Sequence, residues 1–231
     1  MFQFKQFTIH QEQTAMKVGT DGVLLGAWAE PERASFILDI GTGTGLLALM
    51  AAQRNPQARI DAVEIEPEAA KQARENVTAS PWNERIEVHP LSVFDFTPKH
   101  LYDCILCNPP FFINSTKNPD KGRSLARHTD TLSPIALAKT VSDLLAPQGY
   151  FYLVLPPTEA NVFIEHAHCQ QLHIARITHV LPNPDKVPKR FLMKFGRTEM
   201  VPETDELVVE LSRHEYSPEY IRLTKDFYLK F

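Results

Sequence analysis

Residues 36–45 read FILDIGTGTG, and this stretch decides the fold class. Its first half is an apolar run with one acid, which predicts a buried strand over Phe36–Ile40. Its second half is a turn with a glycine at every other position. The segment that follows, from about Leu46 to Gln53, is rich in Leu, Met and Ala, and this composition predicts a helix. A strand, a glycine turn and a helix in this order form the first unit of a nucleotide-binding α/β fold.

The glycine spacing differs from that of the dinucleotide fingerprint, which requires a glycine three positions after Gly43, where Leu46 stands. The D-x-G-x-G-x-G form resembles the S-adenosylmethionine loop of Rossmann-like methyltransferases. This resemblance implies that backbone amides approach the cofactor and that one carboxylate reaches its amino group. The residues concerned are Asp39, Gly41, Thr42, Gly43 and Gly45. A tight turn that binds nothing is the alternative.

A second strand is predicted over Arg59–Glu64, and it ends on an acid about twenty residues past the glycine turn. An acid in that place suits a bidentate hydrogen bond to ribose hydroxyls. Pro67 then begins a helix at its first position, so the nearby Glu66 can serve the helix dipole alone. We therefore expect Glu64, not Glu66, to bind the ribose.

A third short strand, Ile86–Val88, is followed by Asp95 between Phe94 and Phe96. An acid between two aromatic rings just past a strand suits the adenine end of a cofactor, because the carboxylate accepts from the amino group while a ring packs on the base. A helix cap flanked by core phenylalanines is the alternative.

The stretch Asn108-Pro109-Pro110-Phe111 follows an apolar run over Asp103–Cys107, which predicts another buried strand. Two prolines cannot donate to a sheet ladder, so the strand must stop at Asn108. The side-chain oxygen of Asn108 and the carbonyl of Pro109 can together hold an –NH₂ group, and Phe111 offers a face for a planar base. Such a clamp aims the amine at an electrophile, which is catalysis by positioning. We assign Asn108 to the cofactor site as well. The alternative is a strand-end turn with a surface phenylalanine.

The N-terminal segment carries alternating aromatics over residues 1–13, which predicts an edge strand or an arm over the core. A helix through Ala29 follows, for which Thr20 or Asp21 is the expected N-cap. Its expected buried side consists of Val23, Leu24, Ala27 and Trp28. The same polar pair could instead face a ligand. We expect residues 1–30 to cover the cofactor site, with Lys17 and Thr20 among the cofactor-binding residues.

The rest of the chain alternates helices and strands. Predicted are a helix from Ser133-Pro134 to about Leu145, strands over 150–155 and 172–181 around a helix over 158–170, strands Phe191–Phe195 and Glu206–Leu211, and a closing helix from Ser217 that buries Ile221, Leu223, Phe227 and Tyr228. This order predicts an α/β fold with a mostly parallel sheet of seven or more strands, helices on both faces and an antiparallel C-terminal hairpin. No linker or repeat interrupts it, so we expect one domain over residues 1–231.

The composition indicates in which cellular compartment the protein is expected. Apolar residues make up 43% of the 231 and charged residues 23%, as in soluble globular proteins. No apolar run approaches the length of a membrane span, and the N-terminus lacks the apolar core of a signal peptide. We expect a cytoplasmic protein with no membrane contact, and a monomer.

The cysteines and histidines do not predict a metal site. Cys104 and Cys107 have C-x-x-C spacing, but residues three apart in a strand point to opposite faces, so core thiols are the expectation. His166 and His168 lie about 200° apart on the expected helix and cannot share an ion.

Nucleic-acid contacts, if any, must come from local patches, because the net charge is −4. Two segments are rich in basic side chains. They are Asn114–Asp130, a long polar loop beside the amine clamp, and Pro182–Arg197. A basic loop at such a site suits a phosphate-rich substrate. An ordinary solvated loop is the alternative.

The four elements, Asp39–Gly45, Glu64, Asp95 and Asn108–Phe111, resemble the class I S-adenosylmethionine-dependent methyltransferases, and the N-P-P-F form resembles their amino-methylating branch. Residues 17–28 and 223–229 resemble the bacterial tRNA1(Val) adenine-37 N6-methyltransferases. This resemblance implies N6-methylation of an adenosine beside the anticodon, with tRNA as partner. Methylation of a ribosomal RNA base or a release-factor glutamine stays open, as does a non-catalytic cofactor- or RNA-binding module.

Overall fold

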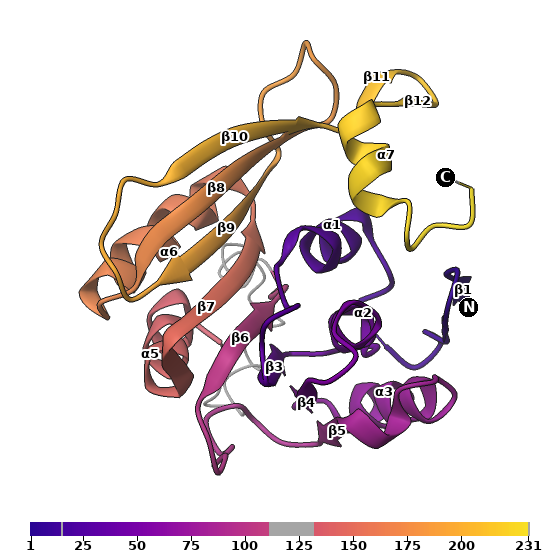
Figure 1. The fold of residues 1–231 in the computed structure, drawn as a ribbon, viewed down its shortest axis with the longest axis vertical. Helices are drawn as coiled ribbons and strands as arrows, with labels where there is room; N and C mark the ends of the chain where they lie inside the picture. Colours follow the sequence, from indigo (N-terminus) through magenta and orange to yellow (C-terminus); the bar gives the residue numbers. More distant parts are fainter. Residues whose placement is uncertain (15, 111–131, 231) are drawn as a thin grey trace, which may run out of the picture.

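The computed structural model describes residues 1–14, 16–110 and 132–230. Within them an eight-stranded sheet has the order β10-β8-β9-β7-β6-β3-β4-β5 (Figure 1). The strands are β3 (Phe36–Ile40), β4 (Arg59–Val63), β5 (Ile86–His89), β6 (Tyr102–Cys107), β7 (Leu145–Leu155), β8 (His173–Leu181), β9 (Arg190–Gly196) and β10 (Glu203–Val208). Only β9 runs antiparallel to its neighbours β7 and β8 within this sheet. The predicted mostly parallel sheet with a C-terminal antiparallel hairpin is confirmed.

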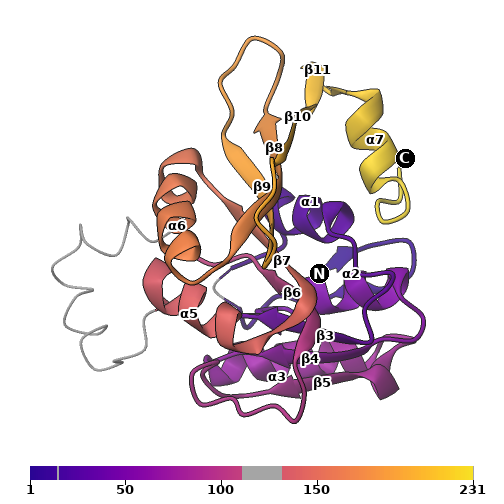
Figure 2. The ribbon, with the colours of Figure 1, turned by 60° about the vertical axis from the view of Figure 1, so that its left-hand side comes forward.

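Helices cover both faces of the sheet (Figures 1 and 2). On one face lie α1 (Thr20–Trp28), α2 (Leu46–Arg54) and α3 (Pro67–Thr78), and on the other α5 (Pro134–Leu144) and α6 (Pro157–Cys169). Alternation along β3 divides the core accordingly, since Ile37 packs in the cluster with α1 and α2 while Leu38 and Ile40 pack in the cluster with α5 and α6. Alternate residues of β3 therefore face the two hydrophobic cores, one on each side of the sheet.

The N-terminal segment packs on the α1–α2 side, as expected of an arm over the core. It forms a short ladder of β1 (Phe2–Gln3) and β2 (Thr8–Ile9), and Phe4, Phe7 and Ile9 are buried. The Asn76 side chain on α3 ties the arm down, because it accepts from His10 N at 2.9 Å and donates to His10 O at 2.8 Å.

The C-terminal elements differ from the prediction in two places. The expected strand Glu206–Leu211 is broken, because β10 stops at Val208 and the chain turns into a separate pair, β11 (Glu210–Ser212) with β12 (Glu215–Tyr216). The closing helix α7 (Pro218–Thr224) begins at Ser217 as expected, but it ends before Phe227 and buries Tyr220 and Thr224. Phe227 is buried beyond the helix end, while Ile221, Leu223 and Tyr228 are half-buried.

The predicted N-cap of α1 is wrong. Gly19 occupies the N-cap position and no side chain caps the helix; Thr20 is exposed. Asp21 instead accepts from Arg190 Nε at 2.7 Å, so a cation on β9 takes the carboxylate that the sequence assigns to capping. The expected buried side of the helix is confirmed, and every residue from Gly22 to Trp28 is buried.

Helices α1 and α2 cross closely at Gly26. A Cβ built there would lie 2.6 Å from Met50 Sδ and 3.1 Å from Met50 Cβ, and Met50 is fully buried. The missing side chain is thus what permits the approach.

We expect Gly26→Ala to lower the free energy of unfolding. Overpacking costs about 1–3 kcal/mol, against a gain of about 1 kcal/mol in helix propensity, which leaves a net loss of about 1 kcal/mol. Denaturant titration measures it. The double variant Gly26→Ala/Met50→Ala should lose less stability than the sum of the two single losses, because the new methyl group then enters the space that Met50 vacates. A double variant no better than the sum of the two single ones would contradict the close crossing.

Two further features of the described residues bear on function. The thiols of Cys104 and Cys107 are buried and burial raises the pKa of each, so they are core residues as expected. Among the described helices, none has both the length and the apolar character needed to cross a bilayer.

Candidate active site

Three strand ends meet at one edge of the sheet. Ile40, the last residue of β3, pairs with Val63 at the end of β4 and with Cys107 at the end of β6. The residues that follow, Gly41, Glu64 and Asn108, therefore leave the sheet side by side. This is the carboxyl edge, where open α/β sheets bind ligands.

The glycine turn holds three residues in the left-handed region, with φ of +68° at Gly41, +56° at Gly43 and +83° at Gly45. Glycine alone adopts these angles at little cost, which explains the alternating pattern. A Cβ added at Gly41 or Gly43 would meet no heavy atom of the described residues within 4 Å. The turn thus exposes bare backbone to open space that a cofactor can enter.

Asp39 lies beneath this turn and is fully buried. Its Oδ2 accepts from Thr42 Oγ1 at 2.5 Å and from Ala48 N at 3.1 Å, whereas its Oδ1 has no hydrogen-bond partner within the described part of the chain. Burial, helped by the negative charge of Glu64, raises the pKa of Asp39 to about 7 against those two hydrogen bonds. A buried acceptor without a partner fits the amino group expected from the sequence.

Glu64 is buried and held by backbone amides. Its Oε2 accepts from Gly43 N at 2.8 Å and its Oε1 from Glu66 N at 3.0 Å. Each oxygen keeps a further lone pair, so the carboxylate can still accept from two ribose hydroxyls. The Glu66 side chain is exposed at the start of α3.

Asp95 is exposed in a turn, where its backbone amide donates to Ser92 O at 3.0 Å. The helix-cap alternative does not apply, because no described helix begins at this turn. Phe94 is 38% exposed, whereas Phe96 is half-buried and packs against the core cluster on the α5–α6 side.

The predicted amine clamp begins where β6 ends, as expected. Asn108 is half-buried, Pro109 is buried and Pro110 is exposed, while Phe111 lies outside the described residues. A Cβ built on Gly22 of α1 would lie 3.5 Å from Asn108 Nδ2, so the first turns of α1 border the clamp. Gly22 is therefore a further candidate site residue that the sequence analysis does not name; its only signal is a glycine inside a helix.

The remaining candidates, Lys17 and Thr20, are exposed just before and at the start of α1, close in sequence to Gly22. The structure thus brings together Asp39, the glycine turn and Glu64 through direct contacts, and Asn108 through strand register.

Comparisons with known proteins agree with this geometry. The sequence model of the protein family described as the methyltransferase small domain matches residues 16–155 of this chain. Proteins named tRNA1(Val) (adenine(37)-N6)-methyltransferase are 49% identical in Parabacteroides distasonis, over 99% of this chain and 98% of the relative, and 50% identical in Phocaeicola vulgatus, over 99% and 97%. A namesake from Trichodesmium erythraeum is 46% identical over 100% and 98%.

The chain belongs to the tRNA1(Val) (adenine(37)-N6)-methyltransferase family. The resemblance read from the sequence is confirmed.

Solved structures show how widely the fold of this family extends. A predicted O-methyltransferase from Agrobacterium tumefaciens has a TM-score of 0.70 at 20% identity, covering 90% of this chain and 96% of that one. A ribosomal protein L11 methylase from Lactobacillus delbrueckii subsp. bulgaricus has a TM-score of 0.59 at 15% identity, covering 81% and 83%. At these identities the likeness supports the Rossmann-like fold alone.

Proposed function

We propose that this protein transfers a methyl group from S-adenosyl-L-methionine to N6 of adenine 37 in tRNA1(Val). Full-length relatives with this name support the substrate. The observation that carries the chemistry is the pairing of Ile40 with both Val63 and Cys107, since it sets the glycine turn, Glu64 and Asn108 at one edge.

The cofactor, when bound, supplies an activated methyl group. On the protein side, Asp39 accepts from the cofactor's amino group, Glu64 accepts from the ribose, and Asp95 takes the adenine end. Backbone of Gly41, Thr42, Gly43 and Gly45 lines the path between them. Residues 1–30 cover the site from the α1 side, with Lys17 and Thr20 facing the cofactor.

The target amine is held by Asn108 and Pro109. The Asn108 side-chain oxygen and the Pro109 carbonyl each accept one N6 proton, Pro110 keeps the turn rigid, and Phe111 stacks on the base. The reaction would need no protein nucleophile and no metal: the N6 amine would attack the methyl carbon as the carbon–sulfur bond of the cofactor breaks, S-adenosylhomocysteine would leave, and the N6 proton would pass to water. A base in an anticodon loop is single-stranded, so it is inexpensive to unstack into such a site.

Fewer basic side chains of the Pro182–Arg197 segment are available to contact RNA than its composition predicts, because several already bind partners within the protein. Arg190 bonds Asp21, Lys194 bonds Glu30 at 2.5 Å, and Arg197 donates to two backbone carbonyls at the end of α5 and the start of β7. Lys186 and Lys189 are exposed on the loop that projects between β8 and β9 (Figure 2). We propose that these two lysines contact tRNA phosphates. The Asn114–Asp130 loop, the other proposed RNA contact, lies outside the described residues.

We expect Lys186→Ala/Lys189→Ala to raise KM for tRNA and leave kcat unchanged, because phosphate contacts position the RNA without touching the reacting atoms. The dependence of log affinity on log salt should become shallower by about 1–2, roughly 0.7–0.9 per lost contact. The matched control is Lys71→Ala on α3, beside the opposite edge strand β5. An unchanged salt dependence in the double variant would remove this loop from the RNA surface.

Nucleoside analysis tests the proposed function. Purified protein and labelled cofactor are offered tRNA1(Val), ribosomes and release factor in separate reactions, and each product is digested and identified. N6-methyladenosine at position 37 of the tRNA is the expected product. Label in a release-factor glutamine or in ribosomal RNA would favour those substrates, and tight tRNA binding with no methylated product would favour the non-catalytic module.

We further propose that residues 1–231 act as one methyltransferase domain, as a monomer in the cytoplasm, where tRNA is found. Light scattering coupled to size exclusion measures the oligomeric state.

A further inference from the structure

The buried side chain of Asn76, on α3, joins the N-terminal arm to the glycine turn by direct hydrogen bonds. Its Oδ1 accepts from His10 N at 2.9 Å, and its Nδ2 donates to His10 O at 2.8 Å and to Thr44 O at 2.9 Å. His10 belongs to the arm, and Thr44 stands between Gly43 and Gly45 of the turn. A single amide, only 1% exposed, therefore connects two segments that are far apart in the sequence.

The glycine turn is held in place by two side chains. Glu64 accepts from Gly43 N at 2.8 Å, and Asn76 binds the carbonyl of the residue that follows. The helix that carries Asn76 also packs directly on the turn, because a Cβ built on Gly45 would lie 3.7 Å from the Cβ of Ala73. The amide of Asn76 thus helps to fix the backbone that is proposed to approach the cofactor.

The arm continues from this contact to the start of α1. The side-chain oxygen of Gln11 accepts from Val18 N at 2.8 Å, which holds the two ends of the intervening loop together. Lys17 and Thr20, which are proposed to face the cofactor, stand at the end of that loop and at the first position of α1. The hydrogen bonds to His10 therefore determine where this wall of the proposed site begins.

We propose that Asn76 is a positioning residue for the cofactor site. It does not touch the cofactor; it holds the glycine turn and the arm in their binding positions before the cofactor arrives. A site that is ordered in advance binds its ligand more tightly, because less of the interaction free energy is lost in ordering the protein. The inference rests on the proposed cofactor site, to which it adds a residue from the third turn of α3.

The connection has a reciprocal consequence. If the arm and the turn are coupled through Asn76, a ligand that binds the turn must also stabilise the arm. S-adenosylhomocysteine should therefore slow hydrogen exchange of the wild-type protein in residues 8–13, more than in residues 31–35 at the amino end of β3. In Asn76→Ala this difference between the two segments should disappear.

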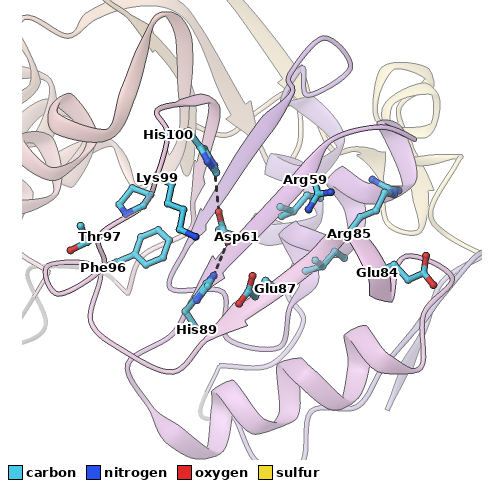
Figure 3. Close-up of a pocket in the computed structure, with 13 residues that line it drawn as sticks. Arg59, Asp61, Glu84, Arg85, Glu87, His89, Phe96, Thr97, Lys99 and His100 are labelled. Carbon is cyan, nitrogen blue, oxygen red and sulfur yellow. Dashed lines mark hydrogen bonds and ion pairs between the residues drawn. The ribbon is translucent and has the colours of Figure 1, made fainter.

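Asn55 provides a matched control. It too is a buried asparagine, and its Nδ2 donates to two backbone carbonyls, those of Pro31 and Ala34, at 2.7 and 2.8 Å. It lies at the amino end of the sheet, where its own carbonyl accepts from Arg85 at 3.0 Å. Arg85 lines a cavity of about 420 Å³ beside Arg59 and the starts of β4 and β5 (Figure 3). Removal of the Asn55 side chain therefore breaks comparable hydrogen bonds away from the glycine turn.

Equilibrium binding of S-adenosylhomocysteine to the full-length protein tests the proposal. We expect Asn76→Ala to weaken binding about tenfold, the effect typical of one buried group left without its hydrogen bond, and Asn55→Ala to change it by less than about twofold. Both variants should lower the Tm of the cofactor-free protein. Steady-state kinetics should show a higher KM for the cofactor in Asn76→Ala with kcat unchanged, because this residue does not contact the reacting groups.

Asn76→Asp is a second variant with the same shape. Its carboxylate can still accept from His10 N but cannot donate to Thr44 O, so it should also weaken binding. Circular dichroism of each variant confirms folding. Unchanged affinity in both variants of Asn76, an equal loss in Asn55→Ala, or equal protection of the two segments in the wild type would overturn the inference. Affinity that is also unchanged in Asp39→Asn would instead locate the failure in the proposed cofactor site.

Discussion

Replacing Asn108 with alanine should lower the rate constant of methyl transfer to tRNA by about 10²- to 10³-fold, the loss typical when a group that positions or stabilises the reacting atoms is removed. Asn108 follows β6 directly and is only half-buried, so its side chain contributes little to the core. Cofactor affinity should stay close to that of the wild type, because Asp39 and Glu64 are intact. Single-turnover kinetics measures the first quantity and equilibrium binding of S-adenosylhomocysteine the second.

Asn83→Ala is the matched control, because this asparagine is exposed in the short helix η1 (Asn83–Arg85), away from the carboxyl edge. It should retain wild-type rates. If Asn108→Ala weakened cofactor binding as much as turnover, holding the cofactor would be the main role of this residue and the amine clamp would have to be sought elsewhere.

The part of the site that could be predicted is the part encoded by neighbouring residues. The alternating glycines at 41, 43 and 45 all require positive φ, and that requirement is visible in the sequence. The predicted strand ends, Glu64 and Cys107, follow from local breaks in apolar runs. The structure ends β4 one residue earlier, at Val63, and parallel register brings Val63 and Cys107 to Ile40. Local sequence patterns and the geometry of a parallel sheet together suffice to predict which residues meet at the carboxyl edge.

Contacts between distant segments could not be predicted in this way. Arg190 and Lys194 look like RNA-binding residues when their own segment is counted, but Asp21 and Glu30, more than 160 positions earlier, bind them. The same ion pair removed Asp21 from the capping role that its position suggested. Charge counted along one segment cannot reveal a partner that only the tertiary fold supplies.

The polar contacts of Asp39 are a further case. The sequence placed this acid near the cofactor, but only the structure shows that Thr42 and Ala48 occupy one carboxylate oxygen and leave the other without a partner. That asymmetry decides which atom is free for a ligand.

Asp39→Asn should weaken binding of S-adenosylhomocysteine, which carries the same amino group, by about a hundredfold, since truncating one partner of a buried charge pair costs ~2–5 kcal/mol. The amide oxygen can still accept from Thr42 and Ala48, so the fold is retained. At pH 8 the cofactor-free variant should have a higher Tm than the wild type, because it no longer buries an uncompensated carboxylate. A residue whose role is structural would give the opposite result, a lower Tm with unchanged affinity.

The pH dependence of stability and of cofactor affinity further separates a cofactor-binding role of Asp39 from a structural one. The pKa of Asp39 is raised to about 7, chiefly by burial, so the folded protein binds more protons than the unfolded chain between the ordinary pKa of an aspartate and pH 7. The contribution of this group to the free energy of unfolding therefore falls as pH rises through that window. Cofactor affinity should change in the other direction, rising about tenfold per pH unit up to pH 7 as the carboxylate ionises and then levelling off. Calorimetric binding between pH 5.5 and 7.5 measures this, and Asp39→Asn should be flat; a wild type equally flat would mean that the amino group of the cofactor is bound by another residue.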